Sequence, residues 1–244
     1  MESRLPVNSD TVFEAASLTK PAFAYVALKL VENGKLELDA PLTKYLPVPW
    51  VPNEPRLKLI TARMVLSHTS GLPHGRPPGS PIALRFDPGA KFADSANGVE
   101  YLRAVLEKLT GQSLPQLMQG GLLQPQKMGR SSLGWEERFR DNFAEGHSRK
   151  GRIELSGNGE FLEATDEEKA QISRDYPEYR YPSAAAGLYT TADDYGRFLC
   201  AMMGPTDTAT LSPRMTGEML KTQTRINESI AWGLGSVTVT TAPE

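Results

Sequence analysis

Phe13-Glu14-Ala15-Ala16-Ser17-Leu18-Thr19-Lys20 is the stretch around which the rest of this chain is arranged. It contains Ser-x-x-Lys, and apolar residues at helical spacing follow it to about Glu32. A helix that begins at about Ser17 would place Ser17 and Lys20 one turn apart on the same face. A serine hydroxyl attacks a carbonyl carbon when a neighbouring base takes its proton. A lysine amine becomes such a base when burial or positive charge lowers its pKa. The motif therefore indicates a serine nucleophile paired with a lysine, although the same two residues also occur at this spacing by chance.

The composition of the chain is typical of a soluble globular protein. Its 244 residues are enough for one large domain or two small ones. The formal net charge of −2 gives no support to binding of nucleic acid or an anionic membrane surface, both of which need a basic patch. The sequence has no apolar run long enough to span a membrane and no apolar signal-peptide core near its start, and it leaves the compartment open.

Cysteine and histidine are scarce. The single cysteine, Cys200, excludes an intrachain disulfide and a cysteine-rich metal site, and its apolar helical surroundings predict that it lies in the core. The three histidines show no metal-ligand spacing, and His74 and His147 show no pattern of partners. We therefore expect neither a metal site nor a cofactor.

Local patterns predict several further elements. Capping residues and apolar periodicity predict helices at about 61–66, 99–110, 114–118, from 192 and at 213–220. Alternating residues predict an edge strand or extended arm at 35–39 and one strand at 232–240. Residues 134–182 are the most polar part, with Thr165 and Glu168 as a capping box, and are expected to be a solvated insertion or, alternatively, a lid.

Several stretches together resemble the beta-lactamase-related serine hydrolases, which include class C beta-lactamases, penicillin-binding DD-peptidases and family VIII carboxylesterases. Phe13–Lys20 resembles the nucleophile segment of that family, and Gly34-Lys35-Leu36-Glu37-Leu38-Asp39 resembles the arm that follows it. Leu66-Ser67-His68-Thr69-Ser70-Gly71-Leu72 matches the family's turn almost letter for letter. Residues 88–98 and 185–191 are similar to its P-G-x-x-F-x-Y-S-N-x-G and A-G-G-L-x-S-T segments. The matches keep the family's order and cover nearly the whole chain.

The resemblance implies a fold and a set of roles. The fold would be an α+β domain of the beta-lactamase/DD-peptidase type, with a helical region packed on an antiparallel sheet and the site between them. Ser17 would be the acylated nucleophile and Lys20 the amine that helps to deprotonate it. The backbone N–H of Ser17 would form half of an oxyanion hole. His68 would be a structural residue of its turn, hydrogen-bonded to backbone.

The second motif departs from the family at Asp94, which stands where the family has a tyrosine that shares the general-base role. Aspartate is shorter and far more acidic, and beside Lys20 it would favour the ammonium form. Ser95-Ala96-Asn97 reads as Ser-x-Asn if the motif shifts by one residue, which would make Ser95 a catalytic residue. Asp94 could instead cap a helix. Asn97 and Tyr189, both in matched segments, are expected to contact substrate.

The ends of the matched region also depart from the family. A third, Gly-rich motif that supplies the other oxyanion donor should follow Val239 and is absent, and strands that normally precede Ser17 are mostly missing. The sheet is therefore expected to lack strands, so that 1–244 forms a single incomplete domain. A truncated product, a second copy completing the sheet as a homodimer, or a degraded relative would each account for this.

The resulting expectation is a serine hydrolase that cleaves a carboxylic ester or amide through an acyl-enzyme on Ser17. Short-chain esters are the expected substrates, followed by beta-lactams and D-alanyl peptides. Relatives of this kind are often periplasmic or secreted. The alternative is a non-catalytic relative that binds a ligand or partner, which Asp94 and the absent third motif would explain.

Overall fold

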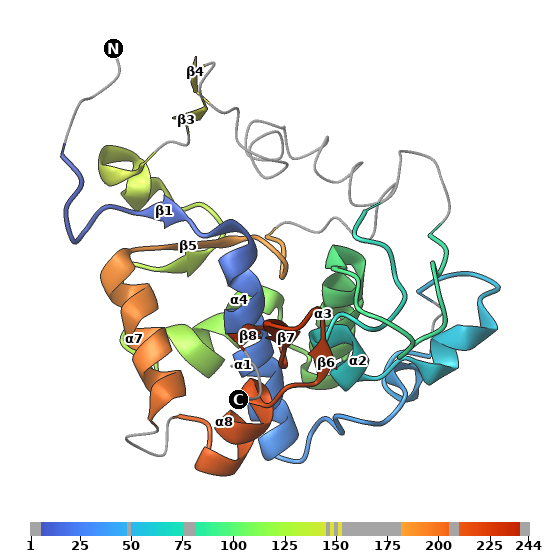
Figure 1. The fold of residues 1–244 in the computed structure, drawn as a ribbon. Coiled ribbons are helices and arrows are strands. Elements are labelled where there is room, and N and C mark those ends of the chain that lie inside the picture. Colours follow the sequence, from blue (N-terminus) through green and yellow to red (C-terminus); the bar gives the residue numbers. More distant parts are fainter. Residues whose placement is uncertain are drawn as a thin grey trace.

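The computed structural model describes residues 6–47, 50–75, 82–144, 147–148, 151–152, 182–204 and 210–239. Helix α1 (Thr19–Glu32) runs through the middle of the molecule, with the other helices around it (Figure 1). These are α2 (Ala62–Leu66), α3 (Ala96–Thr110), α4 (Leu114–Met118), α7 (Ala192–Met203) and α8 (Pro213–Leu220). Short 3-10 segments are η1 (Ala16–Leu18), η2 (Leu42–Lys44), η3 (Pro55–Leu59) and η5 (Glu137–Asn142), and η4 (Gln119–Leu123) is one π-helical turn.

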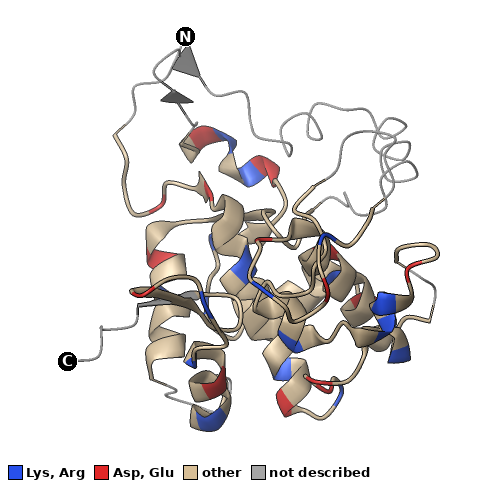
Figure 2. Cartoon of the chain, turned by 45° about the vertical axis from the view of Figure 1, so that its right-hand side comes forward, with Lys and Arg blue, Asp and Glu red and all other residues tan. Residues whose placement is uncertain are grey.

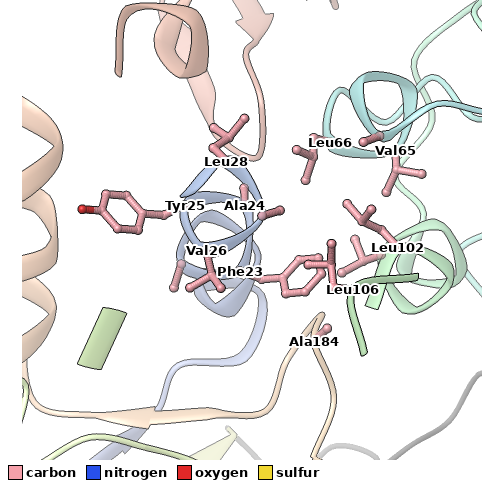
Figure 3. Close-up of a cluster of buried hydrophobic side chains, with 14 of the residues drawn as sticks. Phe23, Ala24, Tyr25, Val26, Leu28, Val65, Leu66, Leu102, Leu106 and Ala184 are labelled. Carbon is pink, nitrogen blue, oxygen red and sulfur yellow. The ribbon is translucent and has the colours of Figure 1, made fainter. Parts of the chain in front are cut away.

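Helix α1 is buried because apolar residues occupy almost its whole circumference. Tyr25 points toward α7, where its ring meets the edge of Phe198 at 5.8 Å between centroids, and Phe23 points toward α3 (Figure 3). A helix that is apolar all round belongs in the interior, where each fully buried large side chain contributes about 1.5–3 kcal/mol. The helix that carries Lys20 is thus also the centre of the core.

Two three-stranded antiparallel sheets flank this helix. In the first, β5 (Leu188–Thr190) lies between β1 (Phe13–Glu14) and β2 (Ser132–Leu133), with Phe13 opposite Thr190 and Leu133 opposite Leu188. In the second, β7 (Ile230–Trp232) lies between β6 (Thr224–Arg225) and β8 (Val237–Val239). A further pair joins β3 (His147–Ser148) to β4 (Gly151–Arg152). Helices with short antiparallel sheets confirm the predicted α+β class.

Most predicted helix boundaries are confirmed. Thr61, Thr191 and Ser212 each accept a hydrogen bond from the backbone N–H three residues on, at 3.2–3.3 Å. Gly111 ends α3 in the left-handed conformation, with φ 70°. Among the described residues, no helix has both the length and the apolar character that crossing a membrane requires. Acidic and basic residues are interspersed in Figure 2, in line with the near-zero net charge.

Four local predictions are wrong. Helix α1 begins at Thr19, because Ser17 belongs to the preceding 3-10 turn. Residues 35–39 form bends and a turn rather than an edge strand or an extended arm. The segment 232–240 does not form one strand, because the chain reverses between β7 and β8. Cys200 is exposed, because it lies on the outer face of α7 while Phe198, Ala201 and Met202 face inward.

The expectation of a polar insertion at 134–182 falls mostly outside the described residues, and so does the capping box at Thr165 and Glu168. Its described beginning holds η5, where Phe139 is buried against Trp135 and Tyr189. This first part of the segment is therefore anchored to β5 by an aromatic cluster.

Candidate active site

Ser17 lies in a tight turn that delivers the chain from β1 into α1. Ala16 has φ 45°, a left-handed conformation that costs a residue with a Cβ about 1–2 kcal/mol. Thr19 holds the turn, because its Oγ1 donates to the Ala16 carbonyl at 2.6 Å and accepts from the Leu188 N–H at 3.0 Å. The turn leaves Ser17 exposed at the solvent-facing start of a buried helix.

Lys20 reaches back from the first turn of α1 to this serine. Its Nζ lies 2.8 Å from Ser17 Oγ and 3.4 Å from the carbonyl oxygen of Ala185. The residue is only 6% exposed, and its burial lowers the pKa of the amine, against the opposing effects of Asp94 and Glu100. Lys20 therefore loses its proton more readily than an exposed lysine does, and a base for Ser17 must be in this neutral form.

The turn that carries Ala185 is fixed by a buried carboxylate, Glu100 of α3. Glu100 Oε1 accepts hydrogen bonds from Ser183 Oγ at 2.7 Å, from the Ala184 N–H at 2.8 Å and from the Ala185 N–H at 3.3 Å. Its other oxygen lies 3.3 Å from the guanidinium of Arg103. Burial raises the pKa of Glu100, whereas Arg103 and Ser183 lower it. Sequence reasoning missed Glu100, although its place one helical turn before Arg103 in a mainly apolar helix was a usable signal.

Asp94 lies at the edge of the site between two histidines. Its Oδ2 is 2.7 Å from His74 Nδ1, and its Oδ1 is 3.4 Å from His68 Nε2. The fold thus gives His74 a partner for which the sequence showed no pattern. No spacing in the sequence could have revealed this contact, because the fold brings a loop residue against Asp94, which lies just before the N-cap of α3.

His68 supports the turn as expected. Its Nδ1 accepts from the Ser95 N–H at 3.1 Å, and its ring lies against Trp232 at 5.0 Å and Phe92 at 5.8 Å between centroids. Burial lowers the pKa of His68 to about 4, so the ring is neutral at pH 7. Because Nδ1 is the acceptor, Nε2 carries the hydrogen and faces Asp94.

The other predicted site residues have structural contacts. Ser95, and not Asp94, caps α3, because Ser95 Oγ accepts from the Gly98 N–H at 2.9 Å and also donates to the Pro73 carbonyl at 3.0 Å. Ser95 is buried, and its hydroxyl makes both of these hydrogen bonds within the fold. Asn97 is buried too, and its Nδ2 donates to the His74 carbonyl at 3.4 Å.

Tyr189 is fully buried on β5, within rings contributed by Trp135, Phe139 and Phe143. The structure thus brings Ser17, Lys20 and Asp94 into one neighbourhood and places Tyr189 in a hydrophobic cluster. In the described part of the chain, no group of three His, Cys, Asp or Glu side chains is arranged to hold a metal ion.

Comparison with known proteins places this chain in a family. The sequence profile of the beta-lactamase family matches residues 1–239. Esterase EstB from Burkholderia gladioli is 30% identical over 242 aligned residues, which cover 82% of this chain and 59% of EstB. Protein Rv1367c from Mycobacterium tuberculosis is 24% identical, with 84% of this chain and 57% of that protein covered. The chain thus spans less than two thirds of the length of these relatives.

Solved structures share the fold. A penicillin-binding protein from Bacillus halodurans has a TM-score of 0.73 at 20% identity, covering 98% of this chain and 73% of that one. EstCE1, described as a hydrolase with promiscuous acyltransferase activity, has a TM-score of 0.75 at 22% identity, covering 98% and 72%. These comparisons give no support to the homodimer considered from the sequence. The profile match over nearly the whole chain and the relationship to EstB show that this chain belongs to the beta-lactamase family.

Proposed function

We propose that this protein is a serine hydrolase that cleaves carboxylic esters through an acyl-enzyme on Ser17. The observation that carries the proposal is the 2.8 Å contact between Lys20 Nζ and Ser17 Oγ, made by a buried lysine whose pKa is lowered. Lys20 takes the hydroxyl proton as Ser17 Oγ attacks the carbonyl carbon, and the leaving alcohol departs with a proton. Water then hydrolyses the acyl-enzyme and restores the serine.

Short-chain esters are the substrate class that we favour. The support comes from the name and the 30% identity of esterase EstB, which covers most of this chain. The exposed position of Ser17 suits a small ester that approaches from solvent. Beta-lactams and D-alanyl peptides are the next classes to assay, because the same acyl transfer applies to a strained or terminal amide.

A non-catalytic binding role is the second candidate, and Asp94 is the observation that favours it. A carboxylate in this position raises the pKa of Lys20 and so opposes the loss of its proton. The proposal of catalysis requires that burial outweighs this effect, as the net lowering of the Lys20 pKa supports. Asp94→Tyr separates the two candidates, because labelling of Ser17 by a fluorophosphonate becomes faster if only the base of Ser17 is impaired.

The deciding experiment is intact mass after incubation with a small fluorophosphonate. We expect one adduct on the parent protein and none on Ser17→Ala. Ser229→Ala is the matched control, because Ser229 is also exposed but lies in the turn between β6 and β7. A folded parent protein that forms no adduct, or an adduct that persists in Ser17→Ala, would overturn the catalytic proposal and leave the binding role.

A further inference from the structure

The group that activates water for hydrolysis of the acyl-enzyme is a separate question from the base of Ser17. Lys20 Nζ already occupies the hydrogen-bonding position beside Ser17 Oγ. Asp94 replaces the tyrosine on which the resemblance placed a share of the general-base role. The contacts of Asp94 with His68 and His74 point to a histidine as the group that could take over the role of general base.

Among the described residues, the contacts around Asp94 leave His74 Nε2 as a basic nitrogen that faces no assigned donor. His68 Nε2 carries the hydrogen and lies 3.4 Å from Asp94 Oδ1, since its Nδ1 accepts from the Ser95 N–H. His74 Nδ1 lies 2.7 Å from the other Asp94 oxygen, and a carboxylate can only accept, so Nδ1 of His74 carries the hydrogen. In the neutral ring, Nε2 of His74 is then the acceptor.

From this arrangement we infer that His74, oriented by Asp94, is the general base for the water that hydrolyses the acyl-enzyme. The inference rests on the proposed function. His74 Nε2 takes a proton from water as the water oxygen attacks the acyl carbon. The imidazolium then returns the proton to Ser17 Oγ as the carbon–oxygen bond to the enzyme breaks. The products are the carboxylic acid and the free serine, with no other reactant needed.

Accessibility and charge both fit this role. The side chain of His74 is 58% exposed, so bulk water reaches it, whereas His68 is buried and packed between rings. The Asp94 carboxylate stabilises the imidazolium that forms on His74. The charge of Asp94 also raises the pKa of Lys20 and of His68, and His74 and Lys20 lower the pKa of His68. Asp94, Lys20, His68 and His74 therefore lie close enough to affect one another. Asp94 is on this view a positioning residue, and Lys20 and His74 serve successive steps.

The test separates acylation from deacylation with p-nitrophenyl acetate and the fluorophosphonate. For His74→Ala we expect the burst of p-nitrophenol and the fluorophosphonate adduct to be retained, and steady-state turnover to fall about 100-fold. The acetyl form on Ser17 should accumulate in intact mass. Added imidazole should restore part of the turnover, because the removed side chain was exposed.

Asp94→Asn gives a readout that a merely structural role would not produce. Loss of the carboxylate removes one effect that raises the Lys20 pKa, so acylation should be unchanged or faster while deacylation slows. Asp87→Asn is the matched control, because Asp87 is an exposed aspartate in the loop before α3 that pairs with Arg56; both of its rates should stay at the parent values. Turnover that is unchanged in His74→Ala, or that falls together with acylation and without imidazole rescue, would overturn this inference alone. A parent protein that forms no adduct would overturn the proposed function with it.

Discussion

Lys20 combines two requirements that oppose each other. Its burial lowers the pKa of the amine and so prepares a base, but a buried ammonium is costly to the folded state. Because the pKa is lower in the folded than in the unfolded chain, the unfolded chain binds more protons between the two pKa values. The contribution of Lys20 to stability therefore becomes more favourable as the pH rises through that window, toward the ordinary value of 10.5.

The Lys20→Met substitution tests both the role of Lys20 as a base and the cost of its burial to stability. We expect the rate of fluorophosphonate labelling to fall by at least about 100-fold, because Ser17 loses its base, without any fall in Tm at pH 7. In the parent protein the labelling rate should rise with pH up to the lowered Lys20 pKa, and in Lys20→Met that rise should disappear. Intact mass at several pH values and thermal unfolding measure both effects. Lys29→Met, on a later turn of α1, is the control, and a Lys20→Met protein that keeps parent labelling rates would exclude Lys20 as the base.

Helix α3 supports the site through Glu100, which ties the 183–185 turn to the helix. Gln keeps the volume of Glu but turns an N–H₂ group toward donors that need an acceptor. Glu100→Gln should therefore lower the free energy of unfolding by about 1–3 kcal/mol. Labelling of Ser17 should also slow, since the Ala185 carbonyl contacts Lys20.

Urea unfolding and labelling kinetics of Glu100→Gln measure these two effects. Glu107→Gln is the matched control, because Glu107 accepts from the same Arg103 and from the Leu114 N–H, whereas Glu100 accepts from the 183–185 turn. Equal effects of the two substitutions on labelling would show that the turn does not depend on Glu100.

At the scale of elements, local chemistry predicted most helices and missed what depends on contacts between distant segments. The side-chain oxygens of Thr61, Thr191 and Ser212 accept from backbone N–H groups three residues on, so these local caps could be predicted from the sequence. The start of α1 could not, because the left-handed Ala16 is held by Thr19 and β5. The closeness of Ser17 and Lys20 could be predicted from the motif, whereas the contacts of Glu100 and the pairing of His74 with Asp94 required the fold. Cys200 was misplaced because helical periodicity alone did not fix which face of α7 is inward.

The turn between β7 and β8 packs against the first turns of α1, and this contact joins the sheet β6–β8 to the helices. Gly235 donates its N–H to the Leu66 carbonyl at 2.8 Å and has φ +87°. A Cβ at Gly235 would lie 2.3 Å from the Cβ of Ala24 and 3.4 Å from the carbonyl oxygen of Lys20. The adjacent strand also places Trp232 against His68. The hairpin of β7 and β8 therefore packs against the helix turn that carries Lys20 and against the ring of His68.

Gly235→Ala should consequently destabilise the protein and disturb the site together. The substitution adds a left-handed alanine and a steric overlap with α1, for which we expect a loss of about 3 kcal/mol in the free energy of unfolding. Labelling of Ser17 should slow, because α1 must shift where it carries Lys20.

Gly34→Ala is the control that measures the cost of the left-handed backbone alone, since Gly34 has φ +70° and a Cβ there would meet nothing within 4 Å. We expect it to lower the free energy of unfolding by about 1 kcal/mol and to keep the labelling rate of the parent protein. Urea unfolding and fluorophosphonate kinetics of the two variants decide the matter. Equal losses of stability would show that the hairpin yields without moving α1, and slower labelling in Gly34→Ala would show that labelling reports stability rather than the position of Lys20.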